Sequence, residues 1–226
     1  MARAGSKRKP LSRERIEIAA LALIERNGLE AFSTRKLAAE LGCEAMSIYH
    51  HFPSKAHIMD ALLDRVLGSI DVPPDDLPWR DRMRRLLFAY RAMALNHPEF
   101  FQFVALHRTN TRGGLAMLER ILRIFEDAGF DTESMARLFR AVGYYLTGAA
   151  LDETAGYAKG PTATDPVPDD VAARDFPLIT AANSYFRPEE REATFVLGLD
   201  IMLAGVAARA PASGKKIDRR KPRSGR

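Results

Sequence analysis

Apolar residues recur every three to four positions along most of the chain, which is the spacing of a helix with one buried face. The first such run places Ile16, Ala20 and Leu23 on one face. Ser12, a residue type that caps helix N-termini, stands before this run, and Asn27-Gly28 supplies a stop after it. The pattern therefore predicts a helix between Ser12 and Asn27.

Three shorter helices follow, and capping residues and proline set their limits. We expect them to run from Ser33 or Thr34 through Glu40, from Glu44 to His51, and from Ser54 to about Ser69. Gly42 suits a left-handed turn after the first of them, because it has no Cβ. Pro53 separates the other two.

Residues 71–78, DVPPDDLP, interrupt the helical spacing and mark a boundary or a linker. Further helices are expected beyond it at 79–96, 98–108, 114–128, 132–155 and 188–209. Residues 156–187 carry four prolines and no clean period. They are predicted to form a long connection with one short helix near 169–183. Because no strand-like alternation of useful length occurs, the predicted fold class is all-α.

Hydrophobic residues make up 46% of the 226 residues, and the one cysteine excludes an internal disulfide framework. Residues 1–15 carry a net charge of +5 and residues 209–226 a net charge of +7, which leaves −7 for the rest. We therefore predict basic disordered segments at 1–11 and 210–226, of a kind that often touches polyanions. Because neither a membrane span nor a signal peptide is evident, we expect a cytoplasmic protein without a membrane partner.

The stretch STRKLAAELGCEAMSIYHHFPSK, residues 33–55, reads as two short helices joined by a tight turn. Ile48 and Phe52 are four residues apart on the second helix and can be buried together. This leaves an outward face made of Ala45, Met46, Ser47, Tyr49 and His50. Such side chains can contact thymine methyls, bases and phosphates in a major groove, so the stretch predicts a helix-turn-helix.

This stretch resembles the DNA-binding unit of the tetracycline-repressor (TetR) family. The matching elements are Thr34-Arg35, the Leu37/Ala38/Leu41-Gly42 core and turn, Ser47-Ile48-Tyr49, and Phe52 with Lys55. The resemblance extends back to Arg15 and forward to Leu63.

The resemblance also implies a role for each matching position. Thr34 and Arg35 would meet DNA at the start of the second helix, and Lys55, aided by Ser54, would bind a phosphate. The groove-facing positions would be Ala45, Met46, Ser47, Tyr49 and His50. Because the first two of these offer no bidentate hydrogen bonds, readout would rely on apolar contacts, on Arg35 and on DNA shape.

Three residue types in this stretch also have a simpler interpretation. Tyr49 taken alone would be a core aromatic, and only its place in the motif favours DNA contact. His50 and His51 diverge by about 100° on a helix, so they cannot chelate an ion together, and no metal site is expected. Cys43, in the turn, is interpreted as core packing rather than as a redox sensor.

The resemblance divides the chain into a DNA-binding domain, residues 12–57, and a helical bundle, residues 58–209. It implies that the bundle binds a small-molecule effector and dimerises, as in the tetracycline repressor's own branch. A pocket needs an apolar wall and a few converging polar groups. The candidate lining residues are Tyr90, Met93, Phe103, His107, Phe125, Tyr144 and Thr147.

Two small-residue stripes are candidates for a dimer contact, because small residues let helix backbones approach closely. Glycine inside a helix otherwise costs about 1 kcal/mol. Packing within the chain would explain the stripes equally well, whereas the resemblance favours a two-fold four-helix interface. The candidate interface residues are Gly143, Ala150, Gly198, Ile201, Met202 and Gly205.

The sequence thus predicts a ligand-responsive transcriptional regulator, with repression favoured over activation. As a homodimer it would bind a palindromic double-stranded operator whose half-sites are about 34–36 Å apart, and an effector would release it. The alternative is an all-α ligand-binding protein or enzyme with an incidental helix-turn-helix. The sequence contains no Gly-rich phosphate loop and no converging Ser/His/Asp set, which would support the alternative. No catalytic residue and no cofactor are therefore predicted. The acidic pair Asp152-Glu153 is interpreted as an exposed feature at a helix end.

Overall fold

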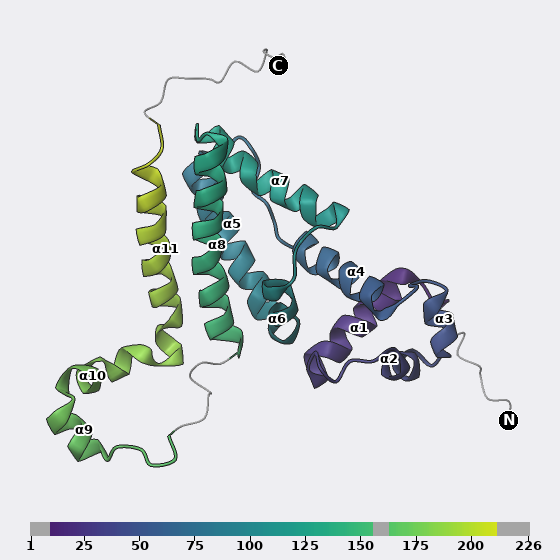
Figure 1. Cartoon of the computed structure of the whole chain (residues 1–226), viewed down its shortest axis with the longest axis horizontal. Helices are drawn as coiled ribbons and strands as arrows, with labels where there is room; N and C mark the ends of the chain where they lie inside the picture. Colours follow the sequence, from purple (N-terminus) through teal and green to yellow (C-terminus); the bar gives the residue numbers. More distant parts are fainter. Residues whose placement is uncertain (1–9, 156–162, 212–226) are drawn as a thin grey trace, which may run out of the picture. The chain divides into compact units, whose positions relative to one another are not determined.

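The computed structural model describes residues 10–155 and 163–211, and every regular element within these ranges is helical (Figure 1). The predicted basic segments at 1–11 and 210–226 lie almost entirely outside the described residues. Backbone contacts group the chain into two compact units. The first comprises residues 1–69 and 96–115, and the second comprises residues 70–95 and 116–226.

The first unit begins with two helices that end on glycine. They are α1 (Arg13–Asn27) and α2 (Thr34–Leu41). The Ser12 side chain accepts a hydrogen bond from the Arg15 N–H at 3.2 Å, which confirms it as an N-cap. Ser33, rather than Thr34, caps α2. Gly42 has a φ of 66°, the left-handed conformation expected after α2.

Two more helices complete the core of this unit: α3 (Ala45–Tyr49) and α4 (Lys55–Gly68). The helix predicted over 44–51 is therefore shorter than expected, because turns replace helical bonding after Tyr49. Ser54 caps α4, as predicted. The largest fully buried side chains here come from all four helices and from the turn after α3: Ile16, Ile24, Leu37, Ile48, Phe52, Ile58 and Leu62.

Helix α6 (Pro98–Leu106) and the beginning of α7 (Arg112–Asp127) also belong to the first unit. Phe100 and Phe101 of α6 are fully buried. The grouping of contacts thus differs from a simple division of the sequence at residue 57, because both α4 and α6 pack against α1.

The second unit is built on α5 (Trp79–Asn96), most of α7, α8 (Thr132–Ala155) and α11 (Arg191–Ala207). Helices α8 and α11 run side by side, as Figure 1 shows. The expected bounds of α5 and α8 are confirmed. The last helix begins at Arg191 instead of Pro188, because Pro188 opens a separate 3-10 turn, η3 (Pro188–Glu190).

Two arginines of the second unit expose little of their side chains and form ion pairs. Arg82, 2% exposed, bridges Asp75 and Asp127 at 2.5 and 2.6 Å. Arg91 pairs with Glu153 at 3.0 Å, and only 7% of the Glu153 side chain is exposed. The interpretation of Glu153 as an exposed helix-end residue is therefore wrong, because α8 turns this carboxylate inward onto α5. Asp152 is exposed.

The connection between α8 and α11 carries more structure than predicted. Two short helices, α9 (Asp169–Asp175) and α10 (Pro177–Ala182), occupy the region where one was expected, followed by the 3-10 turn η2 (Asn183–Phe186). None of these elements contains a buried residue. They extend away from α5 and α8 in Figure 1. No helix among the described residues is long and apolar enough to span a membrane.

Candidate functional site

The exposed side of α3 is the first feature of the candidate site. Ile48 and Phe52 are fully buried, so they fix which side of α3 faces the core. Met46 and Tyr49 are 63% and 37% exposed. Met46 thus leaves most of a large apolar side chain in solvent, on a helix of only five residues.

A hydrogen bond joins the exposed face of α3 to α2. The Thr34 and Tyr49 hydroxyl groups lie 3.1 Å apart and share a hydrogen bond. This contact joins the start of α2 to the end of α3, so that two predicted DNA-contacting residues are brought together. Arg35, the next residue of α2, is exposed and has no hydrogen-bond or ion-pair partner among the described residues.

The remaining predicted DNA-contacting residues lie on or beside the same helices. Ala45 and Ser47 are half-buried and His50 is exposed. The Ser54 hydroxyl accepts from the His57 N–H and lies 2.8 Å from His57 Nδ1. It is thus engaged in capping α4. The nine residues come from three successive helices of one unit, α2, α3 and α4, and the short turns that join them.

Lys55 has a local partner that the sequence did not indicate. Its ammonium group donates to the Phe32 carbonyl at 2.9 Å and lies 5.3 Å from the centre of the Phe32 ring. An ammonium group has three donors, so two remain for a phosphate. The carbonyl and the ring hold Lys55 at the N-terminus of α4, where the helix dipole also favours an anion.

Arg13 is a basic residue that sequence reasoning missed. Its guanidinium donates to the His51 carbonyl at 2.6 Å and lies 4.2 Å from the centre of the Phe52 ring. These contacts place a positive charge directly after α3. The only available signal was the position of Arg13 at the end of the basic N-terminal stretch, which does not reveal its contact with residues 38 positions away.

The predicted pocket residues are distributed over both units. Phe103 and His107 belong to the first unit, where their rings stack with centres 3.5 Å apart. Tyr90 and Thr147 meet in the second unit through a hydrogen bond between their side chains. Burial raises the pKa of the Tyr90 phenol, and this hydrogen bond opposes part of that effect.

The other three pocket candidates lie in different surroundings. Met93 is buried, and Phe125 is 1% exposed and packs on Phe130. Tyr144 is 66% exposed and stacks with Arg140. One groove of the second unit, about 400 Å³ in volume, is lined instead by residues of α5 and the preceding linker: Asp71, Pro73, Pro74, Arg84, Arg85, Phe88 and Ala89. The set of seven stays a prediction.

The candidate interface residues separate into covered and open positions. Ala150 is buried, and a Cβ added at Gly198 would lie 2.5 Å from the Tyr145 hydroxyl oxygen of α8. Gly198 is thus needed for packing within the chain. By contrast, Ile201 is 66% exposed, and a Cβ at Gly143 would meet no atom within 4 Å. Met202 and Gly205 are half-buried.

Comparison with known proteins decides the family. Residues 18–62 match the family model of bacterial regulatory proteins, tetR family. Residues 72–210 match the model of the tetracyclin repressor-like C-terminal domain, which covers more than half of the chain. The chain belongs to the TetR family.

Relatives of this TetR-family chain cover most of its length. It is 30% identical over 204 residues to the class A tetracycline repressor of transposon 1721 from Escherichia coli, covering 84% of this chain and 88% of the relative. It is 29% identical over 210 residues to an HTH-type transcriptional regulator of Saccharopolyspora erythraea, covering 91% of this chain and 89% of the relative.

A solved structure of a TetR-family protein, ActR of Streptomyces coelicolor in complex with actinorhodin, is also similar. Its TM-score to this chain is 0.71 at 25% identity, with 90% of this chain and all of ActR covered. The two family models and these full-length relatives identify the chain as a DNA-binding transcriptional regulator with an N-terminal helix-turn-helix and a C-terminal helical domain.

Proposed function

We propose that the protein is a ligand-responsive repressor that binds a palindromic operator as a homodimer. The observation that carries the proposal is the exposed face of α3, where Met46 and Tyr49 project from a buried Ile48-Phe52 anchor. Arg35, on the adjacent α2, adds an exposed guanidinium that can form a bidentate contact with guanine. Lys55 and Arg13 supply positive charge at the two ends of this face for phosphates.

The homodimer proposal is supported by exposed apolar surface in the second unit. On α11, Leu197 and Ile201 are four residues apart and are 61% and 66% exposed. On the neighbouring α8, Tyr144 is 66% exposed. Large contiguous apolar surface is uncommon on a monomer, so these faces are suited to a second copy of the chain. We assign the interface to this stripe rather than to Gly198, which Tyr145 covers.

The segment from α9 to η2 would belong to the same interface. Five of its large apolar side chains are more than half exposed: Phe176, Leu178, Ile179, Tyr185 and Phe186. Short helices without a buried residue gain little stability from their own unit. We propose that a partner subunit covers this segment.

The effector proposal is supported by a polar cluster inside an otherwise apolar bundle. The Arg91–Glu153 pair lies beside Phe195, whose ring centre is 4.7 Å from the Arg91 guanidinium carbon. The Tyr90–Thr147 hydrogen bond adds two hydroxyl groups on the same two helices, α5 and α8. A few polar groups within apolar walls are typical of small-molecule sites. The relatives named above include tetracycline repressors and a protein solved with actinorhodin.

A binding titration tests the proposed function. Fluorescence anisotropy would measure binding of the full chain to a duplex that carries the DNA upstream of its own gene, at several salt concentrations. We expect saturable binding below micromolar protein, with an affinity that falls steeply with salt. A scrambled duplex of the same length is the control, and equal binding to both duplexes would contradict operator recognition.

A further inference from the structure

Residues 96–115 have a special place in the chain. They belong to the first unit together with α1 to α4, which we call the DNA-reading helices. The preceding helix α5 and the rest of α7 belong to the second unit. The segment is therefore joined to the second unit at both of its ends, whereas α4 is joined to it at one end only, at residues 69–70. The contacts between this segment and the DNA-reading helices therefore decide whether a movement of the segment also moves those helices.

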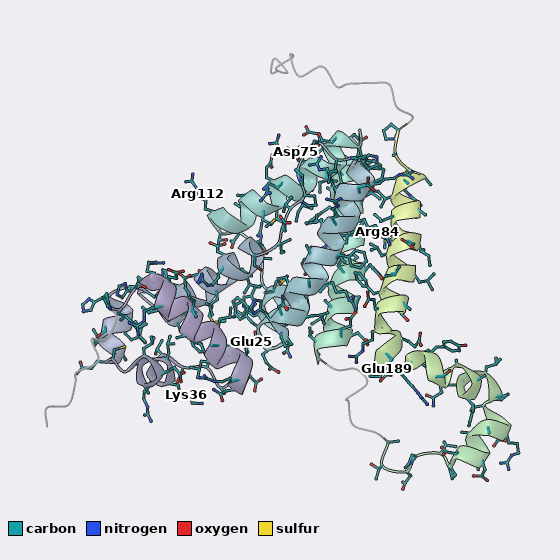
Figure 2. The ribbon with its side chains drawn as sticks, turned by 180° about the vertical axis from the view of Figure 1, so that it is seen from behind. Glu25, Lys36, Asp75, Arg84, Arg112 and Glu189 are labelled. Atoms are coloured by element: carbon teal, nitrogen blue, oxygen red, sulfur yellow. The ribbon has the colours of Figure 1, made fainter. Side chains whose placement is uncertain are left out.

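The first attachment is the Glu25 carboxylate of α1, at the start of α6. It accepts hydrogen bonds from the backbone N–H groups of Glu99 and Phe100 at 3.1 and 3.2 Å. These are among the first N–H groups of α6, which have no partner within the helix. The N-cap residue of α6, His97, makes no capping side-chain bond. A residue of another helix thus supplies the cap, and Figure 2 shows Glu25 where α1 passes α6.

The second attachment is the Asp64 carboxylate of α4, at the start of α7. It accepts a hydrogen bond from the Gly114 N–H at 3.1 Å and another from the Thr111 hydroxyl. A Cβ added at Gly113 would lie 2.8 Å from Asp64 Oδ1. The carboxylate therefore packs against backbone that carries no side chain.

Both attachments follow one design: an acidic side chain of a DNA-reading helix caps a helix of the 96–115 segment. We propose that Glu25 and Asp64 are positioning residues that make this segment move as one body with the DNA-reading helices. Movement of the segment then reaches α3 through α1 and α4. The inference rests on the proposed function, because it gives the route by which an effector would act on DNA binding.

The environment of Glu25 supports a positioning role over a contribution to stability alone. Burial raises the pKa of the Glu25 carboxyl, while the two N–H donors and His97 oppose part of that effect. The two N–H donors therefore offset only part of the effect of burial on this carboxyl. His97 Nδ1 lies 3.8 Å from Glu25 Oε1, and the Glu99 carboxylate adds a like charge nearby.

The test adds DNA and measures hydrogen exchange in residues 96–115. This direction is valid because coupling between the DNA-binding face and the segment is reciprocal. Hydrogen–deuterium exchange of the full chain would be followed with and without the duplex described above. We expect DNA bound at α2 and α3 to slow exchange in residues 96–115 by about fivefold, the low end of measured couplings. Glu25→Gln with Asp64→Asn should abolish this slowing while the DNA-induced protection of α3 remains.

A matched double variant controls for the loss of two negative charges. Glu30 follows α1, and Asp60 lies one turn before Asp64 on α4; both are exposed and have no hydrogen-bond or ion-pair partner among the described residues. Glu30→Gln with Asp60→Asn should keep the full DNA-induced slowing in residues 96–115.

Each other outcome contradicts a stated part of the account. If exchange without DNA rises in the Glu25/Asp64 double variant but the DNA-induced ratio is unchanged, the carboxylates only stabilise the fold and the inference is wrong. If DNA protects α3 of the native chain but leaves residues 96–115 unaffected, the inference also fails. If no duplex binds saturably, the proposed function itself is wrong.

Discussion

The two units of this protein differ in how many large apolar side chains they expose to solvent. In helices α1 to α4, most large apolar side chains are buried, Leu41 is half-buried, and Ile18, Met46 and Tyr49 are exposed. In the second unit, α8, α11 and the α9–η2 segment expose many large apolar side chains. Helices α1 to α4 thus leave a small exposed apolar face on α3. The exposed apolar side chains of the second unit are the surface that the proposed homodimer would cover.

The units also differ in their charges. In the helix-turn-helix, Arg26 and Glu40 form an ion pair at the surface, with side chains that are 54% and 41% exposed. The second unit instead buries the Arg82 side chain between Asp75 and Asp127, and it pairs Arg91 with a Glu153 side chain that is only 7% exposed. Surface pairs contribute little to stability, whereas breaking a buried pair leaves a charge without compensation. Under the proposed function, assembly would depend on the second unit and DNA recognition on the first.

The largest effect is expected for a charge on the exposed stripe of α11. Ile201→Glu would bury one carboxylate in each copy of a two-fold interface, and we expect it to weaken dimerisation by about 3 kcal/mol or more, or about 100-fold. Light scattering during size-exclusion chromatography would then report a monomer. Ile18→Glu, at a similarly exposed position of α1, should remain dimeric.

The next effect compares a buried ion pair with a surface pair. Arg91→Ala leaves the Glu153 carboxylate buried without a partner, so we expect a loss of about 3–5 kcal/mol in the free energy of unfolding. Arg26→Ala, on α1, should cost less than about 1 kcal/mol. Urea denaturation measures both, and equal losses would remove the distinction between the units.

A smaller effect is expected for the exposed face of α3. Tyr49→Ala removes an aromatic side chain and the hydrogen bond to Thr34, and we expect operator binding to weaken by about 1–3 kcal/mol. Circular dichroism should show an intact fold. Unchanged affinity in an anisotropy titration would exclude Tyr49 from the readout surface.

The smallest effect concerns a phosphate contact. Lys55→Ala should weaken binding to operator and scrambled duplexes alike and reduce the salt slope by about one. Because Lys55 also bonds to the Phe32 carbonyl, thermal melting must accompany the titration. A loss confined to the operator would show that Lys55 reads sequence and does not bind a phosphate.

Sequence reasoning recovered the elements whose limits are local. Ser12, Ser33, Gly42 and Ser54 set helix ends through contacts within a few residues, and the structure has them in these roles. The outward face of α3 also followed from the spacing of two buried residues. The family resemblance, now established, came from the same stretch.

Contacts between distant segments were not predictable in this way. Glu153 looked exposed because its partner, Arg91, lies 62 positions earlier, and nothing in the spacing relates them. The packing of Tyr145 against Gly198 was not predictable either, because Tyr145 is on another helix. The Glu25 and Asp64 caps join segments about 50 to 75 positions apart and carry no motif.

A footprint of the full chain on the DNA upstream of its own gene tests the central claim most directly. If paired copies of α3 read successive major grooves, hydroxyl-radical cleavage will show two protected half-sites on one face of the duplex, centred about 34–36 Å apart. Ile201→Glu should lose this paired protection. Protection of a single groove by the native chain, or of no groove at all, would contradict the account.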